Sequence, residues 1–228
     1  MASAVRDLLR AALVRGAYDG RALPDEAALQ RTHAVSRGAV RSALEMLSAE
    51  GLVERTRGAG TFVAAYKTVH RAEGLHGLQR TWGPVRHEVV LRRSVGAHSV
   101  LVDLLRVPAG SAILRLDRRT TIGSEVVGLW TSYLPLHLAE PLATAGSDLS
   151  GDYYDALERL LGCTLGEAEL TTEAVVADPV VARSLRIPVG SAVLRLERIL
   201  RFADGRPLEF AVGRFRGDRL TLSSTSRR

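Results

Sequence analysis

One fourteen-residue stretch occurs twice in this 228-residue chain, eighty residues apart. The sequence LRVPAGSAILRLDR at 105–118 returns as LRIPVGSAVLRLER at 185–198, with most positions identical. Each copy follows a short helical segment, passes a Pro/Gly turn and enters a strand. Because two copies are too few for a solenoid, the repeat predicts a pseudo-symmetric α+β domain with a mainly antiparallel sheet.

The chain is longer than one such domain, so we expect a second domain. Hydrophobic residues make up 46% and charged residues 25%, the usual mixture of a folded protein. The formal net charge of +6 suits a polyanionic partner. Residues 1–66 carry only +2 of that charge, so specific arginines rather than bulk charge must mark any nucleic-acid contact.

Several features that the sequence lacks limit the cellular compartment and the cofactors that we expect for this protein. No apolar run approaches the roughly 20 residues of a membrane helix, and the first twenty residues are too charged for a signal peptide. The single cysteine, Cys163, excludes an internal disulfide and a multi-cysteine zinc site. We therefore expect a cytoplasmic protein with no membrane contact, no metal and no cofactor.

The first 66 residues have the pattern of three helices and a hairpin. Apolar residues at helical spacing predict a helix from Ser3 to about Arg15, and Asp25 is a candidate cap for a short second helix. Ser36 is the candidate cap of a third helix, whose apolar stripe turns Arg37, Gly38 and Arg41 outward. The segments LVERT and TFVAA around RGAG then predict a β-hairpin.

This arrangement is that of a winged helix-turn-helix, and its exposed arginines suit DNA. An arginine fork on a helix in the major groove fits guanine O6 and N7 with two hydrogen bonds. At the hairpin tip, Arg57 beside Gly58 can approach the DNA backbone or the minor groove closely. A solvated helix face is the alternative interpretation of Arg37 and Arg41.

The stretch LPDEAALQRTHAVSRGAVRSALEMLSAEGLVERTRGAGTFV resembles the DNA-binding domain of GntR-type bacterial transcription regulators, and the resemblance covers residues 3–66. It implies double-stranded operator DNA as a partner. The family contacts fall on Ser36, Arg37, Gly38, Arg41, Arg57 and Gly58. One departure is Ala27, where the family often has an arginine, which puts in doubt a backbone contact made there by some relatives.

Residues 67–84 show no clean period, and we interpret them as a linker with at most one short turn. The remainder, residues 85–228, resembles the UTRA effector-binding domain of the HutC subfamily, which has a chorismate-lyase-like fold. The most specific match is GRPLEFAVGRFRGDRLTL near the C-terminus. The resemblance implies a small-molecule effector.

Strand alternation places a pocket in the same region. Glu209, Ala211, Gly213 and Phe215 share one face of a strand, so two minimal side chains should leave room for a small ligand. In the first repeat, Arg118 continues an apolar face and therefore needs an anionic partner. That partner is either a ligand or, as a purely structural alternative, the carboxylate of Glu209 or Asp117.

The family's effector contacts map onto Arg118, Thr120, Asp152, Glu209 and Phe215. Three of these depart from the sugar-phosphate-binding members: Thr120 replaces an arginine, Asp152 a serine and Phe215 a tyrosine. Losing a cation and gaining an anion favours a carboxylate or an uncharged sugar over a phosphate.

The sequence therefore predicts a homodimeric, ligand-responsive transcription regulator, in keeping with a repressor, that binds a palindromic operator. One alternative is a DNA-binding regulator whose C-terminal domain only dimerises and senses no ligand. An enzyme is a weaker alternative, because the sequence contains no nucleophile and base set and therefore no catalytic residue that we can name.

Overall fold

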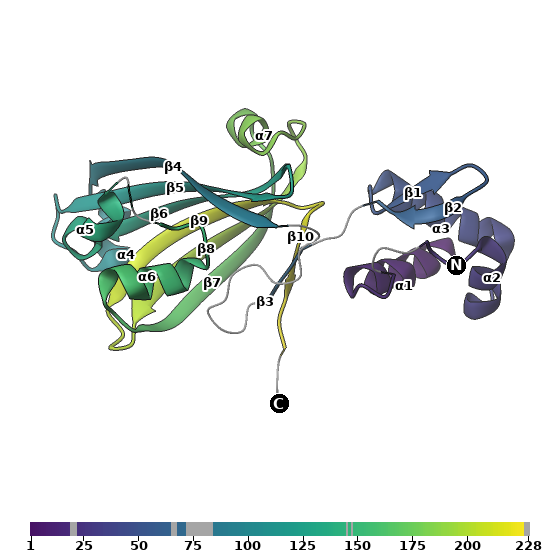
Figure 1. Ribbon diagram of the computed structural model, residues 1–228, viewed down its shortest axis with the longest axis horizontal. Helices are drawn as coiled ribbons and strands as arrows, with labels where there is room; N and C mark the ends of the chain where they lie inside the picture. Colours follow the sequence, from purple (N-terminus) through teal and green to yellow (C-terminus); the bar gives the residue numbers. More distant parts are fainter. Residues whose placement is uncertain (19–21, 65–67, 72–83, 145, 147, 226–228) are drawn as a thin grey trace. The chain divides into compact units, whose positions relative to one another are not determined.

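The computed structural model describes all residues except 19–21, 65–67, 72–83, 145, 147 and 226–228 (Figure 1). The chain divides into two compact units, residues 1–68 and residues 69–228. The first is helical with a small two-stranded sheet, and the second is built on a six-stranded sheet. The predicted α+β class is confirmed, with three helices and a hairpin in the first unit and an antiparallel six-stranded sheet in the second.

The first unit contains three helices and the predicted hairpin. Its elements are α1 (Ala2–Val14), α2 (Glu26–His33), α3 (Arg37–Ala49), β1 (Val53–Thr56) and β2 (Gly60–Val63). The apolar stripes of the three helices face one another and bury a core that includes Leu9, Leu29, Val40, Leu44 and Leu47. This core fixes α3 so that its polar side faces outward.

Side-chain caps set where α2 and α3 begin. Asp25 Oδ1 accepts a hydrogen bond from the Ala28 N–H at 2.6 Å, and Ser36 Oγ accepts one from the Ala39 N–H at 3.3 Å. Each cap satisfies an amide that the helix itself cannot pair. Both predicted caps are confirmed.

The second unit shows that the sequence repeat is a repeat of structure. The first copy forms β4 (Val85–Gly96), α4 (Ser99–Leu105), β5 (Ala112–Ile122) and β6 (Glu125–Pro135). The second copy forms β7 (Leu165–Val176), α7 (Pro179–Leu185), β8 (Ala192–Phe202) and β9 (Pro207–Arg216). The sheet order is β4-β5-β6-β9-β8-β7 with antiparallel pairing throughout, so the two copies meet at β6 and β9.

The turns of the two copies also match in detail. Arg106 and Arg186, the residues that end α4 and α7, both have left-handed backbones, with φ of 51° and 57°. The Ser111 and Ser191 hydroxyls each donate to the carbonyl three residues earlier at 2.7 Å. The two turns therefore have the same hydrogen bonds and similar backbone angles where they lead into β5 and β8.

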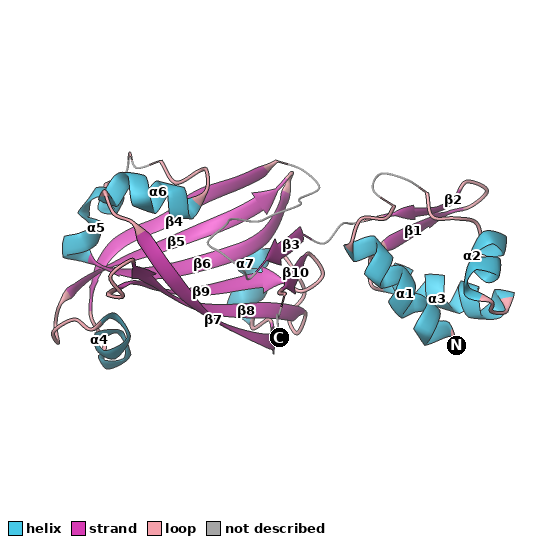
Figure 2. Cartoon of the chain, turned by 90° about the horizontal axis from the view of Figure 1, so that it is seen from below, coloured by secondary structure: helices cyan, strands magenta, loops and turns pink. Residues whose placement is uncertain are grey.

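The helices cover the two faces of the sheet unequally (Figure 2). Helices α5 (Leu136–Ala143) and α6 (Tyr153–Leu161) pack on one face, over side chains such as Leu114, Leu116 and Leu200. Helices α4 and α7 pack on the opposite face, near its two ends. The face beneath α6 is the one that carries Arg118 and Glu209.

A further pair of strands corrects the prediction for 67–84. Residues Thr68–Arg71 form β3, which pairs with β10 (Leu220–Ser223), and the rest of the predicted linker from 72 to 83 lies outside the described residues. A strand of four residues whose partner lies at the C-terminus gives no local periodicity in sequence.

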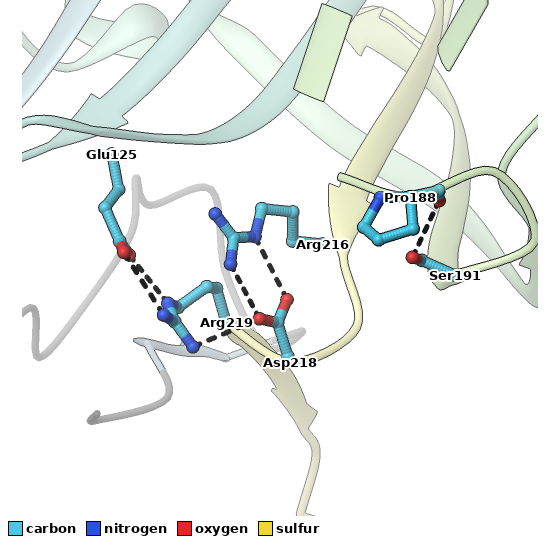
Figure 3. A network of polar contacts seen from close by, with 6 residues as sticks. All are labelled: Glu125, Pro188, Ser191, Arg216, Asp218 and Arg219. Carbon is cyan, nitrogen blue, oxygen red and sulfur yellow. Dashed lines mark hydrogen bonds and ion pairs between the residues drawn. The ribbon is translucent and has the colours of Figure 1, made fainter. Parts of the chain in front are cut away.

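The turn from β9 to β10 is held by ion pairs (Figure 3). Arg216 pairs with Asp218 through two hydrogen bonds of 3.0 and 2.7 Å. Arg219 reaches across to Glu125, with Nε at 2.7 Å from Oε2. These contacts fix the end of β9, which carries Glu209 and Phe215, against the start of β6.

Candidate functional site

The outward face of α3 presents the predicted DNA-contacting residues. Arg37, Gly38 and Arg41 are all exposed there, in the first two turns of the helix. Gly38 has nearly open space where a side chain would stand, with only the Ser36 hydroxyl 4.0 Å away. A backbone without side-chain cover flanked by two guanidinium groups is suited to close approach by a nucleic acid.

Glu26 orients one of these arginines. Its carboxylate accepts from Arg37 Nε at 3.3 Å and from Arg55 Nη2 at 2.7 Å, so it links α2, α3 and the wing. Arg37 remains 73% exposed despite this contact. Arg37 is therefore partly oriented by the protein, whereas Arg41 forms no ion pair within the described residues.

The wing tip carries the remaining two predicted residues. Arg57 and Gly58 are exposed in the turn between β1 and β2. Gly58 has φ +79° and Gly60 has φ +116°, backbone conformations that other residues rarely adopt. The turn therefore depends on glycine, and Arg57 is the first residue of that exposed turn.

The second set of predicted residues lies on the sheet face beneath α6. The strand register pairs Arg118 with Trp130 and Trp130 with Gly213 across three neighbouring strands. It likewise pairs Ser132 with Ala211 and Ala211 with Arg198. Because directly paired residues point to the same side of a sheet, Arg118 and Arg198 face one chamber, as does Glu209, two residues from Ala211 on β9.

Glu209 is the fully buried centre of this chamber. Its Oε2 accepts from Arg198 Nη2 at 2.5 Å, and its Oε1 accepts from the Tyr153 hydroxyl at 2.6 Å. Arg198 also donates from Nη1 to the Tyr154 hydroxyl at 2.6 Å. The carboxylate is therefore paired with a charge and with a neutral donor, both inside the protein.

Arg118 is buried without such a partner. It is only 3% exposed, and its Nε has no hydrogen-bond partner among the described residues. Its guanidinium carbon lies 3.3 Å from the centre of the Tyr153 ring, a cation–π contact. The two carboxylates that could neutralise Arg118 within the protein form ion pairs with other arginines. Asp117 pairs with Arg115 at 2.7 Å, and Glu209 pairs with Arg198.

The pKa values reflect this arrangement. Burial raises the pKa of Glu209, but the charges of Arg198 and Arg118 together outweigh that effect and leave it below its ordinary value. The Ser132 hydroxyl lies near the carboxylate and also lowers its pKa, although its oxygen stands outside hydrogen-bonding geometry. Burial lowers the pKa of Arg118, which shows how poorly its charge is compensated.

Thr120 and Asp152 lie at the edge of the chamber. Thr120 Oγ1 is 3.1 Å from His87 Nδ1, and burial together with the charge of Arg118 lowers the pKa of His87 to about 4, against a smaller opposing effect of Asp152. Asp152 caps α6 by accepting from the Tyr154 and Asp155 amides. An open hollow of about 660 Å³ adjoins these residues, lined in part by His87, Thr121 and Ser150.

Phe215 does not leave the space that strand alternation predicted. Its ring lies 2.3 Å from where a Cβ on Gly128 would stand, and a Cβ on Gly213 would lie 2.9 Å from both the Phe215 and Trp130 rings. The glycines thus make room for the two aromatic rings, which meet edge to face at 5.5 Å. The prediction of an empty space at Gly213 is wrong.

Sequence reasoning missed the residues that α6 and β4 bring to the chamber. Tyr153, Tyr154 and His87 are distant in sequence from Arg118 and Glu209, and no spacing rule joins them. Tyr153 is buried, with 6% exposure, and Tyr154 is partly buried beside it. A signal was present for Arg198, since it is the repeat equivalent of Arg118.

In the described ranges, no helix is long and apolar enough to cross a membrane. Nor do the described His, Cys, Asp and Glu side chains form a group of three or more that could hold a metal ion.

Comparison with known proteins assigns both units. Residues 1–63 match the bacterial regulatory proteins of the gntR family, and residues 84–221 match the UTRA domain. The chain is 32% identical over 221 residues to the HTH-type transcriptional regulator Rv0792c of Mycobacterium tuberculosis, covering 90% of this chain and 78% of that protein. It is 28% identical over 205 residues to the transcriptional repressor NagR of Bacillus subtilis, covering 88% and 83% respectively.

The same fold is found in a crystal structure of PhnF from Mycobacterium smegmatis. The two chains superimpose with a TM-score of 0.69 and 26% sequence identity, over 98% of this chain and 99% of that one. A winged helix-turn-helix joined to a UTRA domain defines a DNA-binding transcription regulator. The chain belongs to the GntR family, in its HutC-like branch of regulators with a UTRA effector domain.

Proposed function

We propose that this protein is an effector-responsive repressor that binds a palindromic operator as a homodimer. The observation that carries the proposal is a buried guanidinium, Arg118, with no anion to pair with it in a chamber that also contains Glu209. An uncompensated buried charge costs stability and is retained where a ligand uses it. Relatives such as NagR and a probable fructoselysine utilization operon repressor of Escherichia coli are named as repressors.

The DNA-binding half of the proposal rests on α3 and the wing. Arg37 and Arg41 read base edges in the major groove, while Ser36, Gly38, Arg57 and Gly58 contact the backbone or the flanking groove. Two such helices related by a two-fold axis match the two half-sites of a palindrome.

The effector half rests on Arg118, Thr120, Asp152, Glu209 and Phe215, together with their neighbours Arg198 and Tyr153. Arg118 binds an acidic group of the effector, because an arginine fork pairs with a carboxylate. Glu209 holds the side chains of Tyr153 and Arg198 beside this site through its two hydrogen bonds. Effector binding regulates DNA binding only if the effector prefers one DNA-binding state over the other.

The test begins with selection of operator DNA from a random library by the full-length protein. Sedimentation of the complex then counts chains per operator, and a titration with carboxylic acids, sugars and sugar phosphates measures DNA release. Two chains per palindrome and release by one ligand class support the proposal. One chain per site contradicts the dimer, and a complex that no ligand alters in either direction favours a UTRA domain that only dimerises.

A further inference from the structure

Tyr153 occupies the centre of the chamber in which the effector is proposed to bind. It is the first residue of α6, and its side chain is buried against the sheet. Its ring contacts Arg118 at 3.3 Å and its hydroxyl donates to Glu209 at 2.6 Å. One side chain therefore contacts both residues that are proposed to recognise the effector.

The ring of Tyr153 is a weaker partner for Arg118 than an anion is. A cation–π contact is not directional in the way a hydrogen bond is, whereas a charge-assisted pair of guanidinium and carboxylate adds two directed hydrogen bonds. Among the described residues, the buried charges here are Arg118 and Arg198 against Glu209, and the partly buried Asp152 lies at the edge of the chamber. The fully buried groups thus have an excess of one positive charge, which a ligand with one negative charge neutralises.

The hydroxyl of Tyr153 also occupies a position that a ligand could use, because it donates to Glu209 as a hydroxyl group of a ligand would. Burial raises the pKa of this phenol, so it remains protonated and donates to Glu209. A hydroxyl on a ligand makes the same hydrogen bond. Tyr153 accordingly gives Oε1 of Glu209 a hydrogen bond and gives Arg118 only a ring contact.

The surroundings of Tyr153 provide a route by which it can be displaced. It follows the Asp152 cap at the start of the nine-residue helix α6. Ser150, two residues before the cap, lines the open hollow of about 660 Å³, and His87 lines the same hollow and contacts Thr120. A ligand that fills the hollow therefore lies close in sequence to the first turn of α6, which carries Tyr153.

We infer that Tyr153 is a built-in occupant of the effector site, which a small carboxylate-bearing effector with one negative charge displaces from Arg118 and Glu209. The inference rests on the proposed function, because it assigns the ligand class and the moving element of that same site. It makes Tyr153 a residue that sets effector affinity and specificity by competition. The energy of its two contacts opposes ligand binding.

The experiment uses Trp130, whose ring lies 4.8 Å from the Arg198 guanidinium and 5.5 Å from Phe215, as a fluorescent reporter. The other tryptophan is removed by Trp82→Phe in the full-length protein. The probe is benzoate, a ring of the size of the tyrosine ring that carries a carboxylate, and phenol is the neutral comparison.

Tyr153→Ala should bind benzoate at least tenfold more tightly than the Trp82→Phe parent does, and at least tenfold more tightly than it binds phenol. Tyr153→Phe, which removes only the hydroxyl donor, should bind benzoate severalfold more tightly than the parent. Tyr133→Ala, which removes a tyrosine stacked on Phe210 on the opposite face, should gain nothing. Circular dichroism verifies that each variant is folded.

Three results overturn the inference. Equal benzoate affinity in the parent, in Tyr153→Phe and in Tyr153→Leu would show that Tyr153 does not compete, and the leucine variant keeps this test valid where alanine fails to fold. Phenol binding as tight as benzoate would reveal a simple cavity. Inorganic phosphate binding more tightly than benzoate would exclude the carboxylate class. Because fluorescence needs no DNA, a failure of effector-dependent DNA release is scored separately and bears on the proposed function alone.

Discussion

Arg118 and Arg198 occupy equivalent positions of the two repeats, yet Arg198 donates to Glu209 at 2.5 Å while Arg118 lies 3.3 Å above the Tyr153 ring. The strand register explains the difference. Glu209 lies two residues before Ala211, the partner of Arg198, and the residue two before Trp130, the partner of Arg118, is Gly128. The first repeat therefore lacks the carboxylate that the second repeat supplies.

This asymmetry predicts that two equivalent substitutions change the free energy of unfolding by very different amounts. Arg198→Met should lower the free energy of unfolding by about 3–5 kcal/mol, because it leaves Glu209 buried without its charge partner. Arg118→Met should change it by no more than about 1 kcal/mol, since no ion pair is broken. Urea unfolding of the two variants measures both values, and equal losses would contradict the assignment.

Glu209→Gln should also destabilise the protein, by about 3 kcal/mol, because Arg198 then remains charged and buried without a carboxylate. Replacing both partners, as in Arg198→Met with Glu209→Leu, should recover most of the loss, since neither member of the Arg198–Glu209 pair is then left buried without the other. A double variant no more stable than Glu209→Gln in urea would show that packing rather than charge governs this position.

Arg41→Ala should weaken binding to the selected operator by about 1–3 kcal/mol and weaken binding to random DNA much less. Arg37→Ala should behave similarly, although Glu26 also loses a partner. Fluorescence anisotropy at a fixed salt concentration measures both affinities. Arg206→Ala, in an exposed turn of the second unit, is the control and should leave both unchanged. Losses of equal size on operator and random DNA would mean that these arginines contact only phosphates.

His87 should make stability depend on pH. Its folded pKa of about 4 lies below the ordinary value of 6.5, so the unfolded chain takes up the proton first as the pH falls. This contribution is absent above pH 6.5, and between pH 6.5 and 4 it destabilises the fold progressively, by up to about 3 kcal/mol. His87→Gln should flatten that part of the stability profile. Replacing the exposed His98 with glutamine should not, and an unchanged profile in His87→Gln would refute the assignment.

Gly128→Ala should cost about 1–3 kcal/mol of stability, because its Cβ would lie 2.3 Å from the Phe215 ring in a packed interior. Gly96→Ala is the matched comparison, since Gly96 lies at the end of β4 with nothing within 4 Å of its Cβ position. Thermal unfolding of the two variants should separate them clearly. A Gly128→Ala variant as stable as Gly96→Ala would show that the Phe215 ring can move aside.

The sequence by itself determined the three helices and the hairpin of the first unit and the repeated unit of the second. Helical periodicity and the Asp25 and Ser36 side chains located α2 and α3, because caps and apolar stripes are local properties of the chain. The eighty-residue repeat predicted two copies of one unit, since identical turn residues impose identical turns. Strand alternation correctly placed Arg118 and Glu209 on inward faces.

Only the tertiary structure decided which of these residues meet. The pairing of Arg198 with Glu209 depends on how β8 and β9 pair, and the contact of Tyr153 with Arg118 depends on how α6 packs over β5. The filled space at Gly213 likewise depends on the rings that Trp130 and Phe215 bring from two strands. Local patterns fix the direction of a side chain relative to its own strand or helix, but contacts between distant segments are set by register and by close packing of the core.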